Sequence, residues 1–187
     1  MTTTQKGFTL VELLIVIAIL AVLAVTVVVV LNPAELLRQA RDSTRISDLA
    51  SINSAISLYL TDVTNPGVGG ANDAACSARA GRLTNATTSP FLAGMTPTTV
   101  TSTAVDGTGW VTVDLVNISG GSPLSRLPID PTNTGNFYYG YACGNGNVLS
   151  YELDTFLEST KYSGLMAIAK DGGDNAGAYE VGSSLTQ

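Results

Sequence analysis

The sequence lacks histidine and has few charged side chains. Of its 187 residues, nine are Lys or Arg and 15 are Asp or Glu, so only 13% are charged and the net charge is −6. Without histidine the chain has no Ser-His-Asp or Cys-His nucleophile pair, no histidine ligand for zinc and no imidazole base near neutral pH. The acidic balance also argues against nucleic-acid binding, which depends on Lys and Arg contacts to phosphates.

Sequence motifs for catalysis are also missing. The chain contains no Gly-rich phosphate loop, no cluster of metal-binding thiolates and no nucleophile elbow. An enzyme built from this chain would have to use carboxylates alone, and the sequence assigns no pair of them to a common cleft. We therefore expect a protein that is not an enzyme and that needs no cofactor.

The apolar residues are concentrated near the N-terminus. Residues 13–31 carry no charge, and their only polar side chain is Thr26. As a helix this run is about 28 Å long, close to the roughly 30 Å of bilayer hydrocarbon. A secretory signal peptide has a shorter apolar core with a small-residue cleavage site behind it, whereas here Gly7 precedes the run. We therefore expect a membrane-spanning helix that stays in the mature protein.

A specific motif stands in front of this run. Residues 6–12 read K-G-F-T-L-V-E, and together with the apolar run they resemble the type IV prepilins and the related pseudopilins. The resemblance is close over residues 6–31, is looser to about residue 60 and is only suggestive beyond. It implies that a prepilin peptidase cuts between Gly7 and Phe8 and methylates the new amino terminus. The alternative is a single-pass anchor with an incidental glutamate.

Glu12 has two possible roles after such a cut. It lies four residues after Phe8, about 6 Å along a helix axis. Pairing with the amine of its own chain would contribute at most about 1 kcal/mol. The resemblance implies instead that Glu12 neutralises the Phe8 amine of a neighbouring subunit as the apolar helices assemble. Removing one partner of such a buried pair costs about 3–5 kcal/mol.

The resemblance also implies a location and partners. The chain would first be a single-pass protein of the inner (cytoplasmic) membrane, surrounded by lipid, with its head outside the cytoplasm. An inner-membrane assembly platform would then add it to an extracellular or periplasmic filament of its own copies or other pilins. The positive-inside rule favours the opposite orientation, because Arg38, Arg41 and Arg45 follow the apolar run and only Lys6 precedes it. We give precedence to the leader motif, which is more specific than a charge count.

A break is expected between two helical segments. Asn32, Pro33 and Glu35 occupy N-cap, N1 and N3 positions, which favours a new helix start. A continuous curved helix is the alternative. We expect a leader at residues 1–7, a transmembrane and assembly helix at 8–31, an amphipathic stem helix at 32–61 and a globular head at 62–187.

The stem segment has one apolar stripe and one charged face. At helical spacing the stripe contains Ile46, Leu49, Ile52, Ile56 and Tyr59, and it requires a packing partner. A face that carries both signs of charge is usually solvated, although it can also form ion pairs between subunits. We expect this solvated face to contain Arg38, Arg41, Asp42, Arg45 and Asp48.

The head is rich in Gly, Ser, Thr and Asn, and its strand signals come late. Residues 110–117 alternate apolar and polar side chains, and residues 137–143 and 148–153 flank a Gly144-Asn145-Gly146 turn typical of a hairpin. Residues 165–170 are a fourth candidate strand. An antiparallel sheet laid against the stem stripe predicts an α+β fold, with a long N-terminal helix packed on a small sheet as in pilins.

The two cysteines, Cys76 and Cys143, lie in this head. If the head is outside the cytoplasm, as the resemblance implies, they are expected to form one disulfide. Free thiols are the alternative. The chain-entropy model gives the disulfide a stabilisation of about 4 kcal/mol.

A group of oxygen-bearing side chains lies near the C-terminus. Asp171, Asp174, Asn175 and Glu180 surround a Gly-rich turn and form a weak candidate calcium site. The pseudopilins include members that hold calcium in a C-terminal loop, although the spacing here differs from an EF-hand. Asp, Asn and Gly in a tight turn explain the same residues without a metal.

The sequence therefore favours a structural subunit of a type IV pilus-like filament. A major pseudopilin of a type II secretion or DNA-uptake system would share the chemistry of the N-terminal helix. A membrane-anchored surface binding module is an alternative from another class, and it would need neither the cut nor Glu12.

Overall fold

The computed structural model describes residues 7–69, 76, 80–85, 98–144, 149–166 and 168–185. The chain divides into two compact units, residues 1–37 and 38–187. The first unit contains helix α1 (Leu10–Leu31) and the start of helix α2 (Pro33–Asp62). The second contains the rest of α2 and the sheet. The leader residues 1–6 lie outside the described residues.

Asn32 separates the two helices. It adopts a left-handed backbone conformation with φ of 40°, which asparagine tolerates better than most residues. Its N–H still bonds to the carbonyl of Val28, and its Oδ1 accepts a hydrogen bond from the Glu35 N–H at 3.4 Å. Pro33 then begins α2, where its lack of an N–H costs nothing. One residue therefore ends α1 and caps the start of α2.

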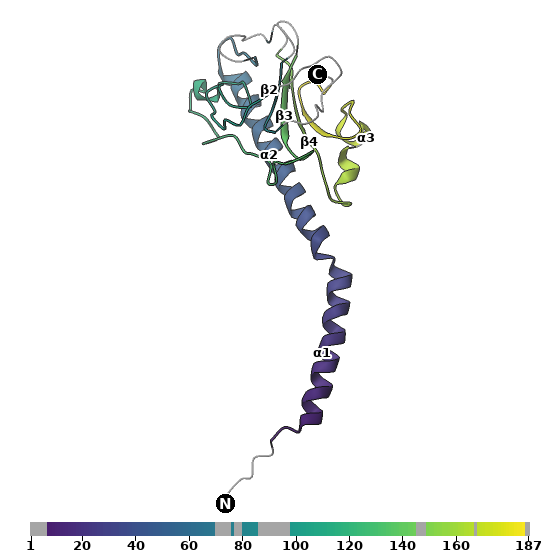
Figure 1. Ribbon diagram of the computed structural model, residues 1–187. Helices are drawn as coiled ribbons and strands as arrows, with labels where there is room; N and C mark the ends of the chain where they lie inside the picture. The colour runs from purple at the N-terminus through teal and green to yellow at the C-terminus, as the bar shows by residue number, and fades with distance from the viewer. Residues whose placement is uncertain are drawn as a thin grey trace, which may run out of the picture. The chain divides into compact units, whose positions relative to one another are not determined.

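The second unit has the expected α+β class. Its five-stranded sheet has the order β2-β1-β3-β4-β5, and every neighbouring pair is antiparallel except β1 and β2, which are parallel. Figure 1 shows α2 running alongside β3 and β4. The strands are β1 (Ala80–Leu83), β2 (Thr98–Thr99), β3 (Tyr139–Cys143), β4 (Tyr151–Thr155) and β5 (Tyr179–Gly182).

The predicted apolar stripe of α2, except for the half-buried Ile46, is part of the core of this unit. Leu49, Ile52, Ile56 and Tyr59 are buried together with alternate residues of β3 and β4. Serine hydroxyls elsewhere on α2 donate to carbonyls four residues earlier, so they need no partner outside the helix. The helix and the sheet thus bury facing apolar surfaces, as the α+β prediction requires.

The hairpin of β3 and β4 is confirmed, but two predicted strands are wrong. Residues 110–117 form an irregular buried segment that ends in the 3₁₀ helix η1 (Leu115–Asn117). Residues 165–170 contribute to the 3₁₀ helix η2 (Ser163–Met166) and the short helix α3 (Ile168–Asp171). Short apolar runs are ambiguous between helix and strand, and here local capping and packing decide. The turn residues Asn145 and Gly146 lie outside the described residues.

The disulfide between Cys76 and Cys143 is present and joins residues 67 positions apart in the chain. Cys143 ends β3 in the middle of the sheet, and both cysteines are fully buried. The bond therefore attaches the segment that follows α2 to the core of the second unit, residues 38–187, which is called the head unit below.

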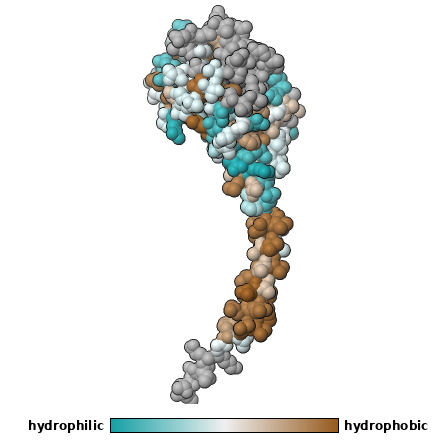
Figure 2. Space-filling model, viewed as in Figure 1, coloured by the Kyte–Doolittle hydropathy of each residue, from teal (hydrophilic) through white to brown (hydrophobic). Residues whose placement is uncertain are grey.

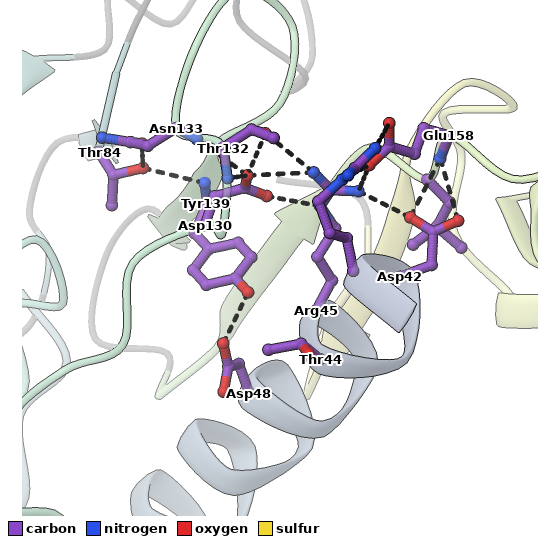
Figure 3. Close-up of polar contacts among 12 residues, drawn as sticks. Asp42, Thr44, Arg45, Asp48, Thr84, Asp130, Thr132, Asn133, Tyr139 and Glu158 are labelled. Carbon is purple, nitrogen blue, oxygen red and sulfur yellow. Dashed lines mark hydrogen bonds and ion pairs between the residues drawn. The ribbon is translucent and has the colours of Figure 1, made fainter. Parts of the chain in front are cut away.

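The charged face of α2 is only partly solvated: Arg38 is exposed and Arg41 and Asp48 are half-buried, but the prediction is wrong for Asp42 and Arg45. Arg45 and Asp42 have no exposed side-chain surface, and their ion pair is joined by two distant carboxylates (Figure 3). Arg45 Nε and Nη2 donate to the two oxygens of Asp130 at 2.6 and 3.1 Å, and Nη1 donates to Asp42 and Glu158 at 2.7 and 2.9 Å. Arg41, which is partly exposed, donates from Nη2 to Glu158 Oε2 at 2.8 Å. This cluster is called the Arg45 cluster and is formed by Arg41, Asp42, Arg45, Asp130 and Glu158. It connects α2 to the loop before β3 and to the segment after β4.

The backbone completes the hydrogen bonds of the Arg45 cluster. The Asp42 carboxylate accepts from the N–H groups of Glu158 and Ser159, and Asp130 Oδ1 accepts from those of Thr132 and Asn133. Burial alone would raise the pKa of Asp130, but its hydrogen bonds, first that from Arg45, lower it below the ordinary value. Hydrogen bonding to Arg41, against the effect of burial, likewise lowers the pKa of Glu158. The cluster is therefore a set of paired charges.

Candidate functional site

The residues of the predicted cleavage motif lie at the start of α1. Thr9 is the N-cap, and its hydroxyl accepts a hydrogen bond from the Glu12 N–H at 3.3 Å. The Glu12 carboxylate turns back and accepts from the Thr9 N–H at 2.9 Å and from the Thr9 hydroxyl at 2.8 Å. This reciprocal capping box satisfies N–H groups that have no partner inside the helix. The sequence analysis did not identify Thr9 as an N-cap, although the T-x-x-E spacing from Thr9 to Glu12 is typical of a capping box.

Gly7 and Phe8 precede this cap in non-helical backbone. Both residues are exposed, and 87% of the Phe8 surface is accessible. A Cβ placed on Gly7 would meet no atom within 4 Å, so nothing in the described chain crowds the peptide bond between these two residues. The bond that the motif marks for cleavage is therefore accessible.

Helix α1 has an apolar surface on all sides. None of its residues is buried, and Figure 2 shows hydrophobic residues covering the visible side of the helix. Among the described residues, one helical stretch, Leu10–Asp62, is long and apolar enough to cross a membrane. A helix with apolar side chains all round needs lipid or other helices to cover it. Glu12 is the only charged residue of α1.

The described part of this region is thus an accessible Gly7-Phe8 bond, a capping box and an apolar helix. Residues 2–28 match the family model described as the prokaryotic N-terminal methylation motif. The chain therefore carries the prepilin-type cleavage and methylation segment of type IV pilins and pseudopilins. No curated protein and no solved structure matches the chain.

The motif has direct functional consequences. It supports a type IV pilin-like or pseudopilin precursor, and it indicates a structural protein. It implies processing by a prepilin peptidase and assembly into a pilin filament. Together with the apolar helix it fits a membrane-anchored pilin.

Among the described residues, the acids Asp171 and Asp174 of the candidate calcium site are not grouped with the carboxylate of Glu180. Asp171 Oδ1 accepts from the Gly173 N–H at 3.1 Å, and Asn175 Oδ1 accepts from the Gly177 N–H at 2.9 Å, so both side chains shape the turn. Asp174 is exposed, whereas Glu180 is buried and accepts from the Asn175 N–H at 3.2 Å.

The structure instead places Glu180 beside two acids of β4. Glu152, Asp154 and Glu180 are all buried, and each offers a carboxylate oxygen within 4.8 Å of the others. The sequence reasoning had missed Glu152 and Asp154. Their spacing of two residues in a strand is a usable signal, because alternate side chains share one face of a sheet.

Proposed function

We propose that the chain is the structural subunit of a type IV pilus-like filament, cut between Gly7 and Phe8, methylated at Phe8 and polymerised through α1. The observation that carries the proposal is an uncovered apolar helix, most of which lies within the matched residues 2–28. Lipid covers α1 before assembly. In the filament, the α1 helices of neighbouring subunits cover one another.

Cleavage creates a positively charged amine at Phe8, with which the Glu12 carboxylate can pair. The cut converts the Phe8 amide nitrogen into an amine, four residues before Glu12 in the chain. An exposed pair at the end of one helix contributes at most about 1 kcal/mol. Between two subunits both charges are buried, and removing one partner costs about 3–5 kcal/mol. The pairing therefore favours one axial register between neighbouring helices.

The capping box gives Glu12 a second role that an experiment must separate from the first. Glutamine also completes a capping box, so Glu12→Gln keeps the cap and removes the charge. Thr9→Ala does the reverse, because it removes the capping hydroxyl and leaves the carboxylate. Loss of an N-cap side chain costs about 1 kcal/mol.

We expect both variants to be processed and inserted like wild type. Glu12→Gln should give few filaments in sheared surface material, whereas Thr9→Ala should assemble. The intact mass of the membrane-bound subunit checks processing, and immunoblotting of sheared and membrane fractions measures assembly. Normal filament yield from Glu12→Gln would refute the pairing between subunits.

The same material separates the pilus from its alternatives. Long filaments in wild-type shear fractions support a pilus, whereas short assemblies retained at the cell envelope support a pseudopilin. A subunit that is neither cut nor assembled would leave the surface binding module as the better account.

A further inference from the structure

The three buried acids at the β4–β5 edge are not explained by processing or assembly. We propose that Glu152, Asp154 and Glu180 form a binding site for a divalent metal cation with oxygen ligands, and that calcium is the ion that fits it best. The site depends on the head unit alone and is independent of the proposed filament function.

The sheet places these carboxyls on one face. In the register of the antiparallel pair, Asp154 lies directly opposite Glu180, and Glu152 is two residues from Asp154 on the same strand. Side chains of β4 that point the other way, Tyr151 and Leu153, belong to the core beneath α2. The three acids therefore gather on the face of β4 and β5 that is turned away from α2.

Asp154 has no basic or amide partner among the described residues that could compensate its burial. It has no exposed surface, and in this part of the chain neither of its carboxylate oxygens has a donor apart from a neighbouring carboxyl. Glu180 Oε1 is also buried without one. The neighbouring carboxyls can donate only when they are protonated. Within the described part of the chain, no lysine or arginine forms an ion pair with Asp154 or Glu180.

Such an arrangement is costly without a cation. Burial first, and then the nearby carboxyls of Glu152 and Glu180, raise the pKa of Asp154 well above its ordinary value. Burial and Glu152 also raise the pKa of Glu180 to about 8. Buried like charges are unfavourable unless they are paired or coordinate a metal. A divalent cation among the three carboxylates removes this repulsion.

The geometry is compatible with calcium. Two oxygens bound to one calcium ion are at most about 5 Å apart, and the three carboxylate oxygens here lie within 4.8 Å of one another. Carboxylates bind calcium through one or both oxygens, so three of them supply up to six ligand atoms. Magnesium usually retains several waters, which a fully buried cluster does not accommodate. Zinc prefers nitrogen and sulfur ligands.

The turn after α3 covers one end of the cluster. Gly173 is buried, and a Cβ at this position would lie 1.7 Å from Glu180 Oε2, so glycine allows the backbone to lie directly on that carboxylate. Glu180 also lines a surface hollow together with Lys170 and Asp171. This hollow places one of the three acids next to solvent, on the side from which an ion would enter.

The test uses the full chain, purified in detergent with its disulfide oxidised. After chelator treatment, calcium chloride is titrated by calorimetry, and thermal unfolding is followed with and without about 5 mM calcium, above the range typical of extracellular sites. We expect one bound ion per chain and a clear rise in Tm. Magnesium chloride at the same concentration should raise Tm less.

Three substitutions locate the ion. Asp154→Asn should lose calcium binding by at least tenfold and abolish the rise in Tm. Asp106→Asn, the matched control, removes an exposed carboxylate elsewhere and should bind like wild type. Asp174→Asn tests the exposed turn and should retain binding. If Asp154→Asn does not fold, Glu152→Gln replaces it, and the wild-type titration still decides whether calcium binds.

Two kinds of result would overturn the proposal. Wild type that shows neither binding heat nor a change in Tm with calcium would mean that the three carboxyls share protons and hold no ion. Binding that survives Asp154→Asn but is lost in Asp174→Asn would place the ion in the turn. Neither result affects the proposed filament assembly.

Discussion

Replacing Arg45 with alanine should destabilise the head more than any exposed substitution. The guanidinium is fully buried and makes five hydrogen bonds to Asp42, Asp130, Thr132 and Glu158. Its removal leaves buried carboxylates without their cation. Breaking a buried charge pair from one side costs about 3–5 kcal/mol, a large part of the 5–15 kcal/mol that stabilises a typical domain.

Trp110 provides the assay. It is the only tryptophan in the chain and it is fully buried in the head, so its fluorescence reports unfolding of this unit. Urea unfolding of the full chain in detergent should give a free energy of unfolding about 3–5 kcal/mol lower for Arg45→Ala than for wild type. Arg45→Lys should fall between them, because a single ammonium cannot bind Asp130 with two parallel hydrogen bonds.

Arg126→Ala is the matched control, because Arg126 is exposed. Its free energy of unfolding should stay within about 0.5 kcal/mol of wild type. If Arg45→Ala were as stable as this control, the Arg45 cluster would contribute nothing to the fold, and the reasoning from buried pairing would be refuted.

Two further predictions concern the same unit. The lowered pKa values of Asp130 and Glu158 mean that the folded state binds these protons less readily than the unfolded chain. The stability from these groups is therefore fully present above about pH 5 and is lost as the pH falls through their folded pKa values. Unfolding measured between about pH 4 and 2, below the range in which the raised pKa values of Asp154 and Glu180 act in the opposite direction, should show this loss. Replacing Cys76 and Cys143 with serine should lower the free energy of unfolding by about 4 kcal/mol, and equal urea midpoints for the two proteins would contradict this.

The N-terminal half of the fold could be predicted because its signals are local. The uninterrupted apolar run specifies α1, and the spacing from Leu49 to Tyr59 specifies the buried face of α2. The β3–β4 hairpin was also visible from its alternating residues. By contrast, β1 and β2 come from Gly- and Thr-rich sequence, whose strand pairing depends on distant partners.

Residues 110–117 show why alternation alone can mislead. Asp114 caps η1 by accepting from the Val116 N–H, and the Thr112 hydroxyl bonds to the carbonyl of Val68. These local and distant hydrogen bonds replace those of a strand, while Val111, Val113 and Leu115 remain buried.

The functional residues were likewise predictable only where their signals are local in the sequence. The processing motif is contiguous, so Gly7, Phe8 and Glu12 could be named from the sequence. The burial of Arg45 could not, because its partners Asp130 and Glu158 lie 85 and 113 residues away. The grouping of Glu180 with Glu152 and Asp154 likewise depends on the register of β4 and β5.

Mass spectrometry of subunits sheared from the cell surface tests the central claim most directly. The account predicts polymeric material whose subunits begin at Phe8, with a mass one methyl group higher than the unmodified chain from that residue. Subunits that retain Met1 and are recovered only as single chains in the membrane would contradict it.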